Sequence, residues 1–268
     1  MKDKSYNDIL NEISENIREI HKNADQTMDS RKPMHNLEDN SKFKNININE
    51  KEEKILRTFY EYSIEDTELI NTIKKRKSIR DYCSKKVSFA HLFKILKYTF
   101  GYRDFETGIY GFNKFPVSFA PSTGGLACIS HYIMVRNVDG LEAGLYRYNR
   151  IDNMLECISL GNCYYKIPKL LYETGFVQDS AFTIILYAEI NKLIWKYGER
   201  AYRFAHIDSG VIAQNMHLIA LDCNIGSCMI AGYQEKEIRK TFNLRKEEIP
   251  MLVMSFGYVK ENQSEERL

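Results

Sequence analysis

A lysine, two tyrosines and two arginines gather within one eight-residue segment of this sequence. They are Lys196, Tyr197, Arg200, Tyr202 and Arg203. The apolar residues that follow recur at helical spacing and predict a long buried helix: Phe204, Ile207, Val211, Ile212, Leu218 and Ile219. Charged and phenolic groups at the edge of a core usually serve chemistry or an ion pair. This segment is therefore the strongest candidate for a functional site that the residues alone indicate.

A second group of polar side chains ends a predicted helix. Arg76, Lys77 and Arg80 supply three cations there, and Ser78 supplies a hydroxyl. Guanidinium forks and a hydroxyl are suited to a phosphate or to a flavin ribityl chain. A cationic helix C-terminus that complements the helix dipole explains the same residues. The motif alone leaves both interpretations open.

Two further segments could let the backbone approach a flat or anionic ligand. In the first, Pro121 and Ser122 precede a threonine and two glycines, which combine a fixed dihedral, hydroxyls and a permissive backbone. In the second, an apolar run ends in Ala231 and Gly232, whose N–H groups could face a ring system. A connecting turn explains the first equally well, and a buried strand or turn explains the second. The first segment is not a P-loop, because no Gly-Lys-Ser or Gly-Lys-Thr follows it.

Length and composition indicate a soluble globular protein with one substantial core. The chain has 268 residues, of which 44% are hydrophobic and 28% are charged. The net charge is +2, so composition gives no electrostatic reason to expect nucleic acid as a partner. No segment approaches the roughly 20 apolar residues of a membrane span, and the first residues lack the apolar region of a secretory signal. A cytoplasmic location without membrane association is therefore expected.

The cysteines and histidines indicate neither a disulfide framework nor a metal site. The six cysteines contain no Cys-x-x-Cys pair, and without a secretion signal they are expected to be reduced thiols, mostly in the core. The six histidines show no His-Glu-x-x-His or comparable ligand spacing. Any redox chemistry would therefore depend on an organic cofactor.

The pattern of elements predicts an α+β architecture, with helices on either side of a small sheet. Helices are expected over residues 5–22, 50–62, 63–75 with Ser63 as the cap, and 88–100 with a serine cap. Strands are expected over residues 131–136, 144–148, 181–189 and 251–256. The polar composition of residues 21–49 predicts a linker. We therefore divide the chain into residues 1–49, an amphipathic helix with a polar arm, and residues 50–268, the compact domain.

Taken in order, these segments resemble the SagB-type, McbC-like dehydrogenases. This branch of the nitroreductase flavoprotein fold oxidises azolines in ribosomal peptides to azoles. The matching segments are residues 76–82, 120–125, 140–148, 196–200, 213–215 and 256–257. The resemblance extends over about residues 70–260 and is specific as an ordered set. This chain departs from the family at Asp208, where the family often has Glu, and at residues 210–211, where it often has Gly-His.

The resemblance implies a nitroreductase-like α+β fold, with a small mixed sheet flanked by helices and FMN at the interface of a homodimer. Each segment then has an implied place around the flavin. The residues that bind its phosphate, ribityl chain and pyrimidine edge in the family are matched by Arg76, Lys77, Ser78 and Arg80. A loop that reaches the flavin from the other subunit is matched by Pro121 and Ser122. The backbone near the flavin N5 is matched by Ala231 and Gly232. The resemblance also implies that Lys196 and Tyr197 are the catalytic pair.

The implied activity is FMN-dependent oxidation of thiazoline or oxazoline rings to thiazole or oxazole in a ribosomally made peptide, with thiazoline the favoured ring. The partners would be the azoline-containing precursor peptide and the cyclodehydratase that forms the ring. Such oxidation removes a proton and a hydride from one ring, so it requires a base and a hydride acceptor. Lys196 can be the base only if burial or the cations Arg200 and Arg203 lower its pKa. Tyr197 could orient the ring or relay the proton.

Two other functions fit the same residues. An NAD(P)H-dependent nitro or quinone reductase of this fold would bind flavin equally well and would not need Lys196. A non-catalytic scaffold subunit of an azole synthetase complex would be colourless or would hold an inert flavin. The N-terminal helix could wrap the dimer or dock a partner, and the first role is favoured.

Overall fold

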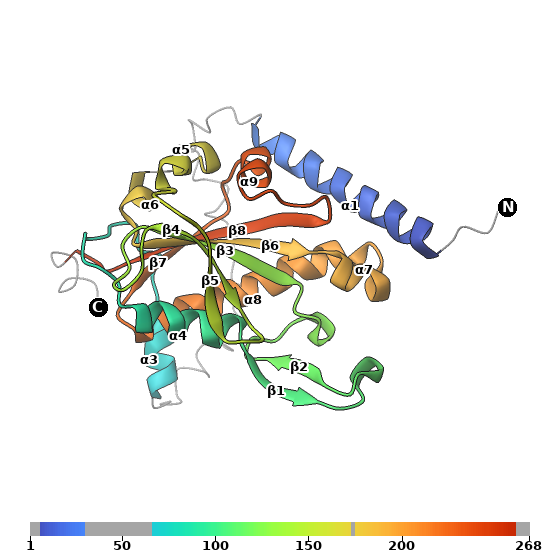
Figure 1. The fold of residues 1–268 in the computed structure, drawn as a ribbon, viewed down its shortest axis with the longest axis horizontal. Coiled ribbons are helices and arrows are strands. Elements are labelled where there is room, and N and C mark those ends of the chain that lie inside the picture. Colours follow the sequence, from blue (N-terminus) through green and yellow to red (C-terminus); the bar gives the residue numbers. More distant parts are fainter. Residues whose placement is uncertain (1–5, 30–65, 173–174, 261–268) are drawn as a thin grey trace, which may run out of the picture.

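A six-stranded sheet forms the centre of the computed structural model, which describes residues 6–29, 66–172 and 175–260 (Figure 1). The strand order is β5-β4-β3-β6-β8-β7, and every neighbouring pair is antiparallel. The strands are β3 (Ile129–Val135), β4 (Gly144–Asn149), β5 (Met154–Leu160), β6 (Phe182–Glu189), β7 (Gly226–Ile230) and β8 (Glu248–Gly257). Parallel pairing in the described residues is limited to isolated bridges, such as Ser78 with Ser227.

Helices cover both faces of this sheet and give three layers (Figure 1). One face carries α4 (Phe89–Phe100) and α8 (Arg200–Asp222), and the other carries α5 (Ile167–Leu170), α6 (Gly175–Asp179) and α9 (Glu235–Thr241). The α+β architecture and the four predicted strands are confirmed. The long helix predicted after the Lys196 segment is confirmed as α8, which runs for 23 residues.

Alternation along the central strands explains the two halves of the core. In β6, Phe182 and Ile184 point into the cluster beneath α4 and α8, whereas Ile185 points into the cluster beneath α5 and α9. All seven residues of 182–188 are buried, as expected for a strand covered on both faces. Phe182 pairs with Phe256 of β8, and their rings stack with centroids 4.7 Å apart.

A separate hairpin stands clear of the main sheet, on the side that carries α7 (Asn191–Tyr197) (Figure 1). Its strands are β1 (Tyr102–Glu106) and β2 (Phe115–Ser118). Gly108 and Gly111 have φ angles of 86° and 80° in the connecting loop, a region of backbone space that favours glycine. This hairpin was not predicted from the sequence, and its loop carries Tyr110.

The N-terminal helix α1 (Tyr6–Asp29) lies against α7 and the start of α8. Ile17 is fully buried, and Asn16 donates a hydrogen bond to Glu199 at 3.0 Å. The buried ring of His21 joins two elements of the body, because Nδ1 lies 2.8 Å from the Tyr202 hydroxyl and Nε2 lies 2.9 Å from the Glu235 carboxylate. The helix predicted over residues 5–22 is therefore confirmed.

The linker predicted over residues 21–49 is wrong for its first part, because α1 continues to Asp29. No glycine or proline interrupts residues 21–29, and His21 fixes this part of the helix on the body. Residues 30–49 and the helix predicted over 50–62 lie outside the described residues, and so does the proposed domain boundary. None of the described helices is long and apolar enough to cross a membrane.

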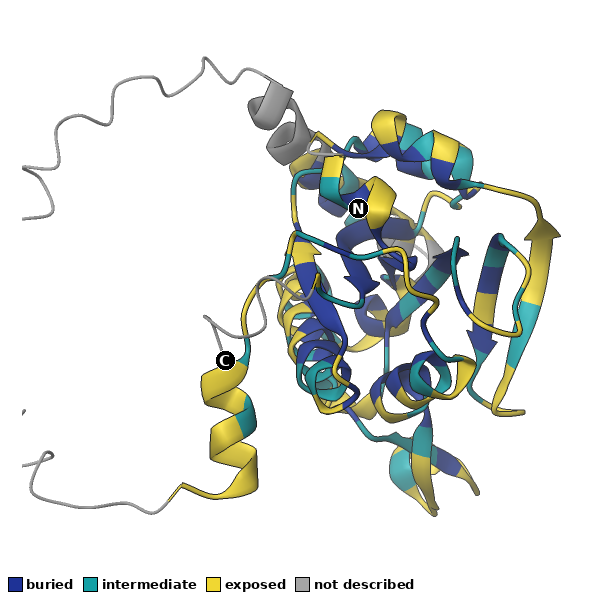
Figure 2. Cartoon of the chain, turned by 90° about the vertical axis from the view of Figure 1, so that its left-hand side faces the viewer, coloured by how far each residue is buried: buried dark blue, intermediate teal, exposed yellow. Residues whose placement is uncertain are grey.

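The helix α3 (Glu68–Lys75) begins later than predicted. Ser63 lies outside the described residues, and the N-cap is Thr67, whose hydroxyl accepts a hydrogen bond from the Ile70 N–H at 3.4 Å. The expected start at residue 63 is therefore wrong, because Asp66 and Thr67 are not helical and Thr67 caps the helix that begins at Glu68. No side chain of α3 is buried, and Leu69 and Ile73 are exposed (Figure 2).

Candidate functional site

Lys196 and Tyr197 end α7 and stand immediately before α8. Gly198 separates the two helices with a φ of 56°, and its N–H closes α7 on the Ile194 carbonyl at 2.9 Å. Lys196 Nζ donates a hydrogen bond to the hydroxyl of Tyr110, which comes from the hairpin loop. The same nitrogen lies 4.4 Å from the centre of the Tyr110 ring and 5.1 Å from that of Tyr197.

Gly124 forms the floor beneath this group. The Tyr110 hydroxyl donates a hydrogen bond to the Gly124 carbonyl at 2.8 Å. A methyl group built on Gly124 would lie 2.5 Å from the Tyr197 hydroxyl oxygen, 2.9 Å from that of Tyr110 and 3.3 Å from Lys196 Nζ. Only glycine fits at this position, where φ is also +61°. The structure thus brings the 121–125 segment and the Lys196–Tyr197 pair into one site.

Lys196 is a hydrogen-bond donor in this arrangement. Hydrogen bonds with the phenols of Tyr110 and Tyr197 raise its pKa, and its side chain is exposed. The condition for Lys196 to act as a base, a pKa lowered by burial or by Arg200 and Arg203, is therefore not met. Arg200 instead bonds the Tyr197 carbonyl at 3.4 Å, and Arg203 lies over the ring of Phe204. The ammonium form therefore dominates near neutral pH.

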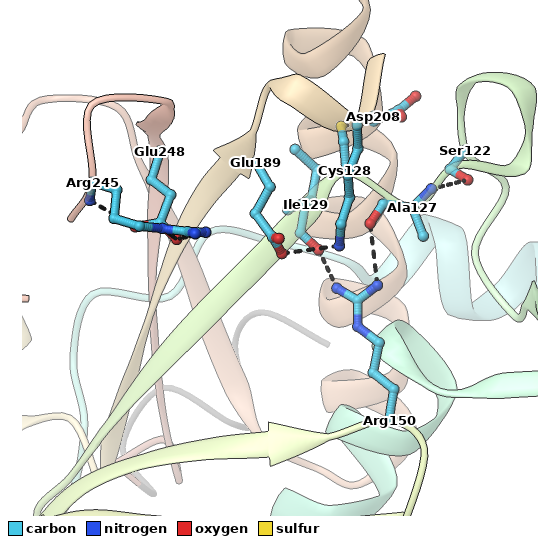
Figure 3. A network of polar contacts seen from close by, with 10 residues as sticks. Ser122, Ala127, Cys128, Ile129, Arg150, Glu189, Asp208, Arg245 and Glu248 are labelled. Atoms are coloured by element: carbon cyan, nitrogen blue, oxygen red, sulfur yellow. Dashed lines mark hydrogen bonds and ion pairs between the residues drawn. The ribbon is translucent and has the colours of Figure 1, made fainter. Parts of the chain in front are cut away.

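The buried carboxylate of Asp208 holds the 121–125 segment on α8. Figure 3 shows the neighbouring contacts of Ala127 with Ser122 and Arg150. Asp208 accepts hydrogen bonds from the backbone N–H of Thr123 at 3.0 Å and from its hydroxyl at 2.8 Å. Burial raises the pKa of Asp208, although these bonds from Thr123 act in the opposite direction. Ser122 accepts from the Ala127 N–H at 3.1 Å, and Arg150 donates to the Ala127 carbonyl at 3.3 Å. The loop is thus fixed at both ends, while Pro121 is exposed.

A basic pocket of about 940 Å³ lies elsewhere on the chain, where α3 ends. Its lining includes Arg76, Lys77, Ser78 and Arg80, together with His217 of α8 and Ser227 of β7. The backbone connects these groups, because Ser78 bridges to Ser227 and the Ile79 N–H donates to the Ser227 carbonyl at 2.9 Å. The four residues that the sequence analysis grouped at 76–80 are therefore brought together with an edge strand of the sheet.

Ala231 and Gly232 follow the other end of that edge strand. The Gly232 carbonyl accepts a hydrogen bond from the Tyr172 N–H at 3.2 Å. A methyl group on Gly232 would meet the Tyr172 ring at 3.5 Å, an ordinary contact, so space alone does not require glycine here. Cys228–Ile230 belong to β7, which confirms the strand interpretation of this segment. The 76–80 group and the 231–232 group flank the two ends of β7.

A single chain does not bring all of the predicted site residues together. Lys196, Tyr197 and Ser122 lie at the start of α8, whereas the basic pocket lies beside His217, near its end. Seventeen residues of helix separate Arg200 from His217, which corresponds to roughly 25 Å. Three residues of these sites were not predicted from the sequence: Tyr110, Asp208 as a loop anchor, and His217. In the sequence, Gly108 and Gly111 are typical of a turn and could have indicated the loop that carries Tyr110.

His217 makes part of the stability depend on pH. Burial, followed by the charge of Arg76, lowers the pKa of His217 to about 4, and Nδ1 lies 2.6 Å from the Ser227 hydroxyl. An unfolded histidine binds its proton near pH 6.5, so between about pH 6.5 and 4 the unfolded chain binds more protons. Stability present above pH 6.5 is therefore lost as the pH falls, by up to about 3 kcal/mol. Urea unfolding from pH 7 to 4 should show a shallower loss in His217→Gln, and an identical pH dependence would contradict this assignment.

The comparison with known families agrees with this architecture. The model of the nitroreductase family matches residues 73–258, more than half of the chain. The chain therefore belongs to the nitroreductase family, and the predicted nitroreductase-like fold is confirmed. Among the described residues, no group of three or more His, Cys, Asp or Glu side chains is arranged to hold a metal ion.

Particular relatives extend this finding. A protein of Methanocaldococcus jannaschii named as a nitroreductase is 27% identical over 72% of this chain and 92% of its own length. The microcin B17-processing protein McbC of Escherichia coli is 28% identical over 53% of this chain, and the match spans about half of McbC, 54%. The fold also resembles a chain of the E. coli microcin synthetase McbBCD complex with truncated pro-MccB17 bound, with a TM-score of 0.65, 20% identity, and coverage of 97% and 99% of the two chains.

Proposed function

We propose that this protein is an FMN-dependent dehydrogenase that oxidises thiazoline or oxazoline rings to thiazole or oxazole in a ribosomally made peptide. The observation that carries the proposal is the convergence of Lys196 Nζ, the Tyr197 hydroxyl and the Tyr110 hydroxyl over Gly124. Membership of the nitroreductase family supports an oxidoreductase, and the similarity to the microcin B17-processing protein McbC supports a peptide substrate. The azoline-containing peptide and the cyclodehydratase that forms the ring are the proposed partners.

The basic pocket fits FMN by the chemistry of its donors. Arg76, Lys77 and Arg80 offer cations for a phosphate, and Ser78 offers a hydroxyl for the phosphate or the ribityl chain. The pocket volume of about 940 Å³ is within the range of cofactor sites. When bound, FMN supplies the two-electron acceptor that no side chain provides. The backbone at 231–232 would then lie beside the ring system, at the far end of β7.

The separation of the two groups supports a homodimer. The proposed catalytic group, Lys196 with Tyr197, lies roughly 25 Å along α8 from the basic pocket. Both α8 and β7 expose apolar side chains, since Ile207 is 54% and Met229 is 38% accessible. A two-fold axis that packs two α8 helices antiparallel would cover these side chains and would bring Lys196 of one subunit to the basic pocket of its partner. The proposed flavin site therefore needs two copies of the chain.

The roles of the catalytic group follow from its protonation. Removal of the ring proton leaves negative charge on the azoline, and the Lys196 ammonium is placed to stabilise that charge by donating a hydrogen bond. A phenol can accept one proton while it releases its own. Tyr197, whose hydroxyl reaches the same point above Gly124, can thus take the ring proton and pass one to solvent. Lys196 therefore acts as a cation in this proposal, and Tyr197 acts as the proton relay.

One specific observation favours a second candidate, an NAD(P)H-dependent nitro or quinone reductase. The M. jannaschii relative is named as a nitroreductase, and the match covers 92% of that protein. Such an enzyme would use the same basic pocket for flavin. It would oxidise NAD(P)H and would give the Lys196–Tyr110 contact no role in the reaction.

A single assay separates these candidates. The purified protein is first examined for the visible spectrum of FMN and then incubated with a thiazoline-containing peptide, and the peptide mass is followed. We expect a yellow protein and a loss of two mass units for each ring without added NAD(P)H. A yellow protein that leaves the peptide unchanged and consumes NADPH would establish the reductase instead. A colourless protein that does neither would indicate a scaffold subunit and overturn the proposal.

A further inference from the structure

The backbone of Tyr110 is held in an unusual conformation at the tip of the hairpin. Its φ is +51°, a left-handed value that tyrosine seldom adopts, and it lies between Gly108 and Gly111. A left-handed conformation of a bulky residue costs free energy and persists where surrounding contacts fix it. Such strain is concentrated at functional sites. The contacts that fix Tyr110 therefore indicate what the conformation serves.

Three contacts fix this side chain. Its hydroxyl donates to the Gly124 carbonyl at 2.8 Å. Its ring meets Trp195 edge-on, with centroids 5.5 Å apart, and meets Phe115 in the same way at 5.4 Å. These partners belong to the loop after Pro121, to α7 and to β2. Tyr110 therefore joins three separate elements at the point where the catalytic group converges.

The single phenol proton decides the direction of the contact with Lys196. Because that proton is donated to the Gly124 carbonyl, the Tyr110 oxygen can only accept a hydrogen bond from Lys196. The ring face adds a cation–π contact, with Nζ 4.4 Å from its centre. None of the ion pairs of the described residues involves Lys196. The phenols and ring faces of Tyr110 and Tyr197 thus hold this ammonium, and no carboxylate of the described residues pairs with it.

We propose that Tyr110 is a positioning residue of the active site, which holds the Lys196 ammonium above Gly124 with its charge directed to the substrate ring. This inference rests on the proposed function and extends it, because it makes the β1–β2 hairpin part of the catalytic machinery. A carboxylate at the position of Tyr110 would hold the lysine equally firmly but would cancel its charge. The phenol holds the lysine and leaves the charge available.

The test compares Tyr110→Phe with wild type and with a matched control. Tyr110→Phe keeps the ring and removes only the acceptor, whereas Tyr110→Leu also removes the aromatic face. The control is Tyr165→Phe, since Tyr165 is an exposed tyrosine with a lysine over its ring, Lys166 Nζ being 5.8 Å from its centre. Two properties are measured: the pH profile of kcat/KM for the thiazoline peptide, and the titration of the Lys196 side chain by NMR with labelled lysine, assigned through Lys196→Arg.

We expect Tyr110→Phe to lower kcat about tenfold with a small change in KM, the loss typical of one hydrogen bond to a charged group, and Tyr110→Leu to lower it further. The Lys196 titration and the alkaline limb of the profile should both move to lower pH in Tyr110→Phe and stay in place in Tyr165→Phe. An unchanged titration, or a wild-type rate and profile in Tyr110→Phe, overturns the inference. If wild type leaves the peptide unoxidised while the titration still moves, the proposed function fails and the contact between Tyr110 and Lys196 stands.

Discussion

Replacing Lys196 by alanine is expected to lower kcat for oxidation of a thiazoline peptide by about 10²–10⁴-fold. The substitution removes the cation that converges with the Tyr197 hydroxyl above Gly124. Lys196 is not among the residues proposed to hold FMN, which are Arg76, Lys77, Ser78 and Arg80, so the variant should keep its yellow colour and its flavin content. Loss of two mass units from the peptide, followed by mass spectrometry alongside the visible spectrum, measures both properties.

The matched control for this experiment is Lys192→Ala. Lys192 lies one turn earlier on α7 and is also exposed, but it pairs with Glu189 at 3.0 Å and does not reach Tyr110. Its removal should leave the rate of oxidation close to that of wild type, since exposed ion pairs contribute little. A Lys196→Ala variant that oxidises the peptide as fast as Lys192→Ala would remove Lys196 from the mechanism.

The fold was largely accessible from the sequence, because buried strands and amphipathic helices have periodic apolar patterns. The strand predicted over 181–189 and the helix predicted after Arg200 belong to such segments, and both are confirmed. The β1–β2 hairpin was missed, since residues 102–106 are mostly exposed and charged and lack an apolar stripe. The edge strand β5 was missed for a different reason: its sequence is mostly apolar, but apolar and polar residues do not alternate along it, and most of its side chains are exposed.

The site was accessible only in pieces. Short motifs identified Lys196 and Tyr197, and the structure places both beside the 121–125 segment. The role of Tyr110 could not be predicted, because Tyr110 and Lys196 are 86 residues apart in the sequence and only the fold brings them together. The condition for Lys196 to act as the base, a lowered pKa, is not met in the structure. The sequence shows that Arg200 and Arg203 follow Lys196 in the chain, but it does not show that the phenols of Tyr110 and Tyr197 lie beside Lys196 in space. The pKa of Lys196 depends on these spatial neighbours.

The largest expected loss of stability concerns Phe256, in the strand that the helices cover on both faces. Its side chain is fully buried, and its ring stacks on Phe182 with an interplanar angle of 8°. Phe256→Ala should lower the free energy of unfolding by about 3–5 kcal/mol, through lost burial and the cavity that remains. The corresponding fall in Tm is about 6–20 °C for a domain of this size. Urea and thermal unfolding followed by circular dichroism would measure both quantities.

A double-mutant cycle shows whether the stacked pair itself contributes. Phe182→Ala, Phe256→Ala and the combined variant should give a coupling free energy of about 0.5–1.5 kcal/mol, because direct aromatic contacts add to area burial. Phe112→Ala is the control, since its side chain is 58% exposed in the hairpin loop, and it should cost less than about 1 kcal/mol. Additive losses in the cycle would show that each ring contributes through its own burial alone. A loss in Phe256→Ala no larger than that in Phe112→Ala would mean that the β6–β8 pairing does not form the centre of the core, and that the sheet which carries β7 and the basic pocket is organised in another way.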